Sequence, residues 1–235
     1  MKIGILKADT VRPEWVEEHG EYPDMFRRLL AEQDALVTYC VYDVEHERYP
    51  SDIDEVDAYL LTGSKRSVYE DEPWIHRLAE FVRTLHARKK TLVGICFGHQ
   101  MVAHALGGKV ERSAKGWGVG AQHYQITPNP QATWLDDGED MFSLLASHED
   151  QVIVPAQGAS VVGGSAFCEN AACQVGDHIL TFQGHPEFSA SYARTLATLR
   201  KERIGDERYS YAMATVDNPV EGDRVARWML SFMRG

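Results

Sequence analysis

The sequence predicts an α/β protein: an open, mostly parallel β-sheet in a three-layer arrangement, with helices on both faces and an added small antiparallel β segment. Short apolar runs alternate with amphipathic segments through the first half of the chain, an order typical of strand–helix–strand units. Parallel neighbours need such crossover connections, which are usually helical. Beyond them, over 109–183, short β-rich runs separated by turn residues predict the antiparallel addition.

The predicted elements of the first half alternate between strand and helix. The strands are short and rich in apolar, β-branched and aromatic residues, and the helices have apolar residues at helical spacing. A proline suits the start of the second helix, and basic residues suit its end. We therefore expect strands at 2–7, 36–42, 56–63 and 91–96, and helices at 22–33 and 71–90.

The C-terminal part is predicted to end in two helices, at about 189–204 and at 218–233. In the second helix, Asn218 and Glu221 have the spacing of a capping box. An apolar stripe on the same helix predicts a face that packs on the core rather than on a partner protein. The larger members of that stripe are Val225, Trp228, Met229, Phe232 and Met233.

The composition limits the classes of protein to consider. A chain of 235 residues lies in the size range of one large domain, so we expect a single domain over 1–235, with the C-terminal helices (about 189–235) packed on it. The formal net charge of −11 argues against nucleic acid as a main partner. No apolar run approaches the roughly 18 residues of a membrane span, and the N-terminal run is too short for a signal peptide.

The cysteines point to a reducing compartment. Four cysteines in a chain of this length do not make a disulfide scaffold, so we expect a cytoplasmic protein. Cys168 and Cys173 bracket a turn, but a single pair at this spacing is a weak zinc motif. His99 and His104 are also not spaced like a helical ligand pair, which favours structural roles for both and no metal site.

Residues 94–98, Gly-Ile-Cys-Phe-Gly, have the pattern of a nucleophile elbow between a predicted strand and a predicted helix. Such a turn projects its central side chain from the carboxyl edge of the sheet, and small residues on either side prevent backbone collisions. The helix N-terminus favours a thiolate at Cys96, and the N–H of Phe97 can donate to an oxyanion. The alternative is that Cys96 is a small buried apolar residue.

A base for this cysteine is predicted far along the chain. The strand Ile179–Phe182 runs into Gln-Gly-His-Pro-Glu, so parallel pairing would bring His185 to the same sheet edge as Cys96. Glu187 could then hold the imidazole by a hydrogen bond, as the third member of a catalytic set. Alone, this segment could be a surface turn, but together with the elbow it favours catalysis.

These motifs together resemble those of the class I, or triad, glutamine amidotransferases. The resemblance covers about 56–188, and more weakly the first strands; it implies a flavodoxin-like sheet and a cysteine hydrolase that needs no cofactor. The matching stretches are LLTGSKRSVYED (60–71), GICFGHQ (94–100), KGWGVG (115–120), SHEDQV (147–152) and GHPEF (184–188).

The resemblance implies a role for each matching residue. Cys96 would be the nucleophile that attacks a γ-carboxamide, His185 the general base and acid, and Glu187 the residue that orients His185. The oxyanion would be held by backbone N–H groups of Phe97 and of a residue near Gly63 or Ser64. The substrate-binding residues implied by the resemblance are Gln100, Trp117, Ser147 and His148.

One matching segment departs from the family pattern. Many members have Gly-Gly-Pro where this chain has Gly63, Ser64 and Lys65, and loss of the second glycine reduces backbone freedom there. Lys65 and Arg66 could face a carboxylate of the substrate. The alternative is that both are solvated charges on a loop.

Three functions stay open at this point. The protein could be a glutaminase that passes ammonia to a separate synthetase or acceptor subunit, since the segment after Glu187 is too short for a synthetase domain. It could instead be a stand-alone hydrolase of γ-glutamyl amides or peptides, or a binding protein that kept the fold without turnover. We expect the first, with glutamine or a γ-glutamyl compound as substrate and an acceptor that the sequence does not identify.

Overall fold

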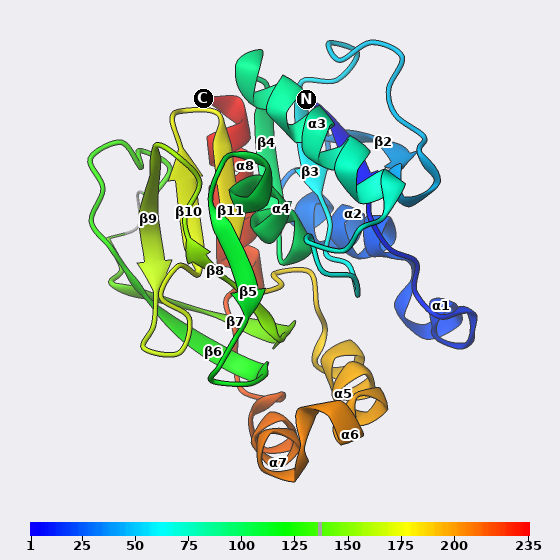
Figure 1. Ribbon diagram of the computed structural model, residues 1–235, viewed down its shortest axis with the longest axis vertical. Helices are drawn as coiled ribbons and strands as arrows, with labels where there is room; N and C mark the ends of the chain where they lie inside the picture. Colours follow the sequence, from blue (N-terminus) through cyan, green and yellow to red (C-terminus); the bar gives the residue numbers. More distant parts are fainter. Residues whose placement is uncertain (136–137) are drawn as a thin grey trace.

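The structure, a computed structural model, describes residues 1–135 and 138–235 and is built on a mixed nine-stranded β-sheet (Figure 1). Its strands are β1 (Lys2–Lys7), β2 (Thr38–Asp43), β3 (Ala58–Leu61), β4 (Thr91–Ile95), β6 (Gly118–Ile126), β7 (Met141–His148), β9 (Ala159–Gly164), β10 (Ala172–Val175) and β11 (Ile179–Phe182). Their order across the sheet is β2-β1-β3-β4-β11-β10-β9-β6-β7.

Five strands, from β2 to β11, form the parallel part of the sheet. Their apolar residues form continuous runs because both faces are covered. In β1, for example, Ile5 packs into the core on one face and Leu6 into the core on the other. The last strand, β11, returns from the end of the antiparallel segment to pair in parallel with β4, with Phe182 opposite Ile95.

Helices cover both faces of this parallel part. On one face, α2 (Tyr22–Gln33) and α8 (Gly222–Arg234) contribute Phe26, Leu30 and Met229 to a shared core with the sheet. On the other face, α3 (Pro73–Ala87) and α4 (Phe97–Ala105) contribute residues such as Leu78 and Met101. The predicted α/β fold, with a mostly parallel sheet between two helical layers, is confirmed. A short α1 (Pro13–His19) and a 3-10 turn η1 (Val44–His46) were not predicted.

The antiparallel addition is confirmed and has two parts. The strands β10, β9, β6 and β7 extend the main sheet beyond β11 with antiparallel pairing. A separate two-stranded sheet pairs β5 (Lys109–Arg112) with β8 (Asp150–Val154). The sequence analysis did not predict β5 or β8 as separate strands, because each is too short for its periodicity to be distinctive.

The C-terminal prediction needs two corrections. The chain after β11 forms α5 (Ala190–Leu199), α6 (Lys201–Ile204) and the unpredicted α7 (Asp206–Thr215), which lie together at one end of the molecule (Figure 1). The capping box of Asn218 and Glu221 is also wrong. Helix α8 begins at Gly222, with Glu221 as its N-cap, while the N–H of Asn218 donates to Thr215 at the end of α7.

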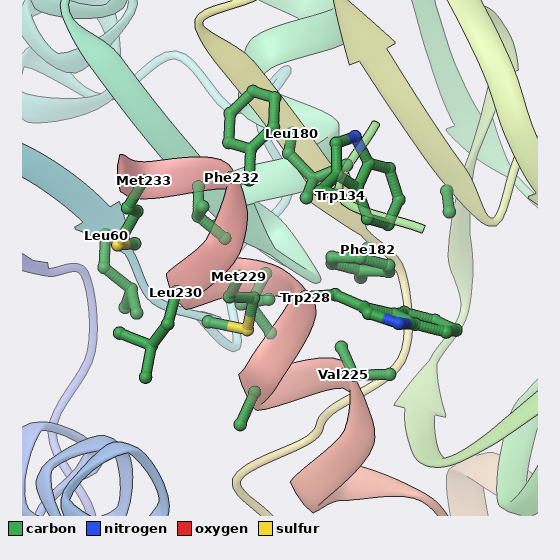
Figure 2. Close-up of a cluster of buried hydrophobic side chains, with 14 of the residues drawn as sticks. Leu60, Trp134, Leu180, Phe182, Val225, Trp228, Met229, Leu230, Phe232 and Met233 are labelled. Atoms are coloured by element: carbon green, nitrogen blue, oxygen red, sulfur yellow. The ribbon is translucent and has the colours of Figure 1, made fainter. Parts of the chain in front are cut away.

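The apolar face of α8 lies against the sheet, as Figure 2 shows, and the prediction that this face belongs to the core is confirmed. Trp228 is 2% exposed, and its ring centroid lies 5.7 Å from that of Phe142 and 5.8 Å from that of Trp134. Phe182 completes this aromatic group, 6.0 Å from Phe142. None of the helices in the described part of the chain has the length and apolar character needed to cross a membrane.

Replacement of Trp228 by alanine is expected to lower the free energy of unfolding by about 3–5 kcal/mol, because it leaves a cavity beside the rings of Trp134 and Phe142. Urea denaturation measures this change. Ser231→Ala, on the exposed side of the same helix, serves as the control and should leave the free energy of unfolding nearly unchanged. A Trp228→Ala protein as stable as the control would contradict the assignment of this face to the core.

Candidate active site

The site is built around Cys96, which connects β4 to α4 in a strained conformation. Its φ of 52° and ψ of −100° lie outside the regions that non-glycine residues normally occupy, at a cost of about 1–3 kcal/mol. The surrounding backbone holds this conformation: the Cys96 N–H donates to Phe182 over 2.8 Å, and the Cys96 carbonyl accepts from Gln100 over 3.0 Å. The cysteine is therefore anchored on one side to β11 and on the other to the first turn of α4.

Two glycines allow the strand and the helix to meet at this sharp angle. A β-carbon at Gly94 would lie 2.7 Å from backbone atoms of Gly98, and one at Gly98 would lie 2.5 Å from the carbonyl oxygen of Leu61. Both contacts are with backbone atoms, which have little room to move. Glycine at these two positions is thus a steric requirement of the elbow.

His185 and Glu187 follow β11 and lie at the same edge of the sheet. Nδ1 of His185 is 2.7 Å from Oε1 of Glu187, and both side chains are buried. The imidazole also stacks on the ring of Phe188, with 3.7 Å between centroids and 7° between planes. The backbone N–H of His185 donates to the carbonyl of Leu145 over 2.8 Å. These contacts fix both the position and the tilt of the imidazole.

The electrostatic surroundings favour a protonated His185. Burial acts to lower the pKa of His185, but the Glu187 carboxylate and the Cys96 sulfur act in the opposite direction and together raise it to about 10. An imidazolium at neutral pH can hold a neighbouring cysteine as the thiolate. The three residues that the sequence predicted as a catalytic set are therefore in one site, with charges that suit a thiolate nucleophile.

The residues whose backbone N–H groups were predicted to hold the oxyanion lie next to Cys96. Phe97 is the first residue of α4, so its N–H has no acceptor within the helix. Gly63 is so close that a β-carbon there would lie 2.9 Å from Cε1 of His185 and 3.7 Å from Cβ of Cys96. Ser64 lines both of the cavities that Cys96 also lines.

The four predicted substrate-binding residues line one cavity beside Cys96. Ser147 and His148 come from the end of β7, and burial lowers the pKa of His148 to about 4, so that it is neutral at physiological pH. Trp117 presents its ring, while the Nε2 of Gln100 already donates to the Asp150 carbonyl over 2.8 Å and to Gln183 over 3.1 Å. Gln100 can therefore offer a substrate only its carbonyl oxygen unless these bonds break.

Gln183 contacts the nucleophile, and the sequence analysis assigned it no role. It is fully buried, and its Nε2 donates to Sγ of Cys96 over 3.6 Å while its Oε1 accepts from Gln100. A donor directed at sulfur favours the thiolate. In the sequence, only its position two residues before His185 could have indicated a role for Gln183. The contact with Cys96 itself depends on the pairing of β4 with β11.

The structure accounts for Lys65 and Arg66 by internal ion pairs. Lys65 pairs with Asp9, whose carboxylate also accepts the Lys65 N–H over 2.8 Å. Arg66 pairs with Glu70 at 2.9 Å. Both side chains are exposed on the loop, as the second alternative expected. They also line the cavity beside Cys96, where each already has a carboxylate partner.

The remaining histidines and cysteines of the sequence analysis have separate surroundings. His99 is buried and its Nδ1 lies 2.8 Å from Oγ1 of Thr181, whereas His104 is exposed on the far side of α4 from that contact. Burial raises the pKa of both Cys168 and Cys173 to about 12, so these thiols are protonated at neutral pH. All four cysteines of the chain are free.

The chain matches a known protein family over most of its length. The family model described as glutamine amidotransferase class-I matches residues 18–199. The chain belongs to the class-I glutamine amidotransferase family.

Individual relatives are similar over different lengths. A glutamine amidotransferase-like protein of Schizosaccharomyces pombe is 31% identical over 98% of this chain and 98% of its own length. Gamma-glutamyl peptidase 2 of Arabidopsis thaliana is 33% identical over 73% of this chain and 64% of its own length. A crystal structure of a glutamine amidotransferase from Thermotoga maritima shares the fold, with a TM-score of 0.74 at 18% identity over 99% of this chain and 96% of that one.

The His185–Glu187 pair generates a prediction about pH. In the wild-type protein, the His185 imidazole is expected to titrate well above pH 6.5. In Glu187→Gln it should titrate at a lower pH, because burial lowers the pKa of His185 and the carboxylate that counteracts this effect is then absent. The measurement is an NMR titration of labelled histidine. Glu207→Gln, which changes an exposed carboxylate on α7, is the control and should leave the His185 titration in place.

The same shift has a consequence for stability. A raised folded-state pKa stabilises the protein fully below about pH 6.5, the unfolded value, and this contribution disappears as the pH rises through about 10. Glu187→Gln should therefore lower the free energy of unfolding more at pH 6 than at pH 10. A wild-type imidazole that titrates below 6.5 would contradict this account.

Proposed function

We propose that this protein is a cysteine hydrolase that cleaves γ-glutamyl C–N bonds through a γ-glutamyl thioester. Cys96 is the nucleophile, His185 the general acid and base, and Glu187 the residue that orients and charges His185. One observation carries the proposal: a strained cysteine at a helix N-terminus lies beside a buried imidazole whose pKa is raised by a carboxylate.

The first half of the reaction forms the thioester. The Cys96 thiolate attacks the γ-carbonyl carbon, and the negative charge moves to the carbonyl oxygen. Backbone N–H groups of Phe97 and of the Gly63–Ser64 segment stabilise this oxyanion. The imidazolium of His185 then donates its proton to the leaving nitrogen, so that the C–N bond breaks and a neutral amine or ammonia departs.

The second half restores the enzyme. Neutral His185 takes a proton from water, and the oxygen attacks the thioester carbonyl. Collapse of this second tetrahedral intermediate expels the Cys96 thiolate and leaves glutamate, which restores the thiolate–imidazolium pair. Glu187 remains a carboxylate throughout and stabilises the imidazolium, as the acid of a catalytic triad does. No step requires a cofactor.

The glutamyl group is assigned to the cavity lined by Gln100, Trp117, Ser147 and His148. The cavity is adjacent to Cys96, and His185 is not among the residues that line it. A neutral His148 and the carbonyl of Gln100 are suitable acceptors and donors for an α-amino acid head group, as is the backbone near Ser147.

Two substrates are compatible with this chemistry. With glutamine, the product is ammonia, which a separate synthetase or acceptor subunit would consume. With a γ-glutamyl peptide, the product is an amino acid or peptide, and the similarity to gamma-glutamyl peptidase 2 favours this second candidate. A role as a binding protein is less favoured, because the strained conformation of Cys96 would then cost stability without any use.

Replacement of Cys96 by alanine is expected to reduce turnover of every substrate by at least about 10⁴-fold while the fold remains intact, since no other group can form the thioester. Release of ammonia from glutamine and of amino acid from a γ-glutamyl dipeptide measures the effect, and circular dichroism checks the fold. Cys40→Ala, a substitution on the half-exposed edge strand β2, is the matched control and should remain active.

Labelling with a glutamine-like alkylating agent provides a second readout. Intact mass spectrometry and peptide mapping should find one label, on Cys96, in the wild-type protein and none in Cys96→Ala. A Cys96→Ala protein that still turns over glutamine or the dipeptide would refute the mechanism. Labelling of the wild type with little turnover alone would indicate a glutaminase that needs its partner.

A further inference from the structure

Arg200 occupies a particular position relative to the nucleophile, at the junction of α5 and α6. Two cavities flank Cys96, and Arg200 lines both of them. The second cavity is lined by His185 and, of the four predicted glutamyl-binding residues, only by Ser147; Gln100, Trp117 and His148 line the first cavity alone. The apolar walls of the second cavity are formed by Tyr22, Phe188 and Leu196.

Contacts with Ser147 and Trp117 hold the guanidinium of Arg200 in place. Its Nη1 donates to Oγ of Ser147 over 2.7 Å and to the Ser147 carbonyl over 3.3 Å. The guanidinium carbon lies 5.6 Å from the centroid of the Trp117 ring, within cation–π range. Nε and Nη2 have no hydrogen-bond partner among the described residues, so one edge of the guanidinium is available.

The charge of Arg200 is also available. Three other cations line the same cavity mouth, and each has a carboxylate partner: Lys65 with Asp9, Arg66 with Glu70, and Arg203 with Glu149. In the described part of the chain, no carboxylate forms an ion pair with Arg200. A fixed arginine with a free edge is suited to bind a carboxylate through two parallel hydrogen bonds.

The position of His185 decides which carboxylate this is. In the proposed reaction, His185 protonates the leaving nitrogen, so the leaving group must extend into the cavity that His185 lines. Ammonia from glutamine has no carboxylate. The leaving amino acid of a γ-glutamyl dipeptide has one, within a few bonds of the scissile nitrogen.

We propose that Arg200 binds the carboxylate of the leaving group and that Tyr22, Phe188 and Leu196 form the walls of a leaving-group subsite. This assignment rests on the proposed hydrolysis of γ-glutamyl bonds. It names the preferred substrate class as γ-glutamyl amino acids or peptides with a free terminal carboxylate, and makes Arg200 a specificity-determining residue.

The test compares γ-glutamyl-leucine with γ-glutamyl-leucinamide, which lacks only the negative charge of the leaving group. For the wild-type protein, kcat/KM should be about 10- to 100-fold higher for the acid, the range expected for a charged hydrogen-bonded pair. In Arg200→Gln this ratio should fall to about one, while Arg200→Lys should keep part of the preference. Arg203→Gln, which alters a neighbouring arginine that already has a partner, is the control and should leave the ratio as in the wild type.

Each outcome is informative. Equal kcat/KM for the acid and the amide in the wild type would overturn the assignment, although hydrolysis itself would stand. An Arg200→Gln protein that cleaves both compounds equally more slowly, with the wild-type ratio, would also overturn it and would point to the glutamyl carboxylate instead.

Calorimetric binding to the Cys96→Ala protein gives the same comparison without turnover. Tighter binding of the acid than of the amide supports the subsite, and equal binding overturns it. If the wild-type protein cleaves neither compound, the proposed chemistry fails, and this binding comparison still tests Arg200 independently.

Discussion

The close approach of β4, α4 and the end of β3 is the constraint on which the site depends. Gly94 and Gly98 let these backbones meet, and the resulting turn holds Cys96 at a positive φ. The same turn accepts and donates hydrogen bonds that join it to β11 and to the first turn of α4. Because β4 and β11 are parallel and adjacent, the residues that follow both strands reach the same edge, which brings His185 to the cysteine.

The electrostatics of the site follow from this geometry. Burial would keep an isolated imidazole neutral, and a buried carboxylate without a partner would be costly. Placed 2.7 Å apart, His185 and Glu187 satisfy one another, and the sulfur beside them adds a further reason for the imidazole to hold its proton. Gln183 also directs an N–H to that sulfur. Residues that follow two neighbouring strands, β4 and β11, thus stabilise the buried charges together.

The parallel part of the sheet and the positions of Cys96, His185 and Glu187 could be predicted from the sequence, because their signals are local. The strand before Cys96 and the strand before His185 are apolar runs bounded by glycine or a polar turn, and the elbow pattern is local. The small β5–β8 sheet and α7 were missed, because their residues are stabilised by packing on distant elements rather than by their own periodicity. The roles of Gln183 and Arg200 could not be predicted either, because each depends on a partner that the fold brings close. That partner is Cys96, just after β4, for Gln183, and Ser147 on β7 with Trp117, just before β6, for Arg200.

The arrangement of α5 to α7 has a consequence for how such a protein can diversify. These helices lie outside the sheet, at the end of the molecule that the chain reaches after β11 (Figure 1). Leu196 of α5 and Arg200, between α5 and α6, line the cavity beside His185. Under the proposed chemistry, two of the leaving-group contacts, Leu196 and Arg200, are therefore encoded in a different stretch of the chain from Cys96, His185 and Glu187. Evolution can exchange one helical segment to change which amine is released, and the elbow that performs the cleavage is inherited unaltered.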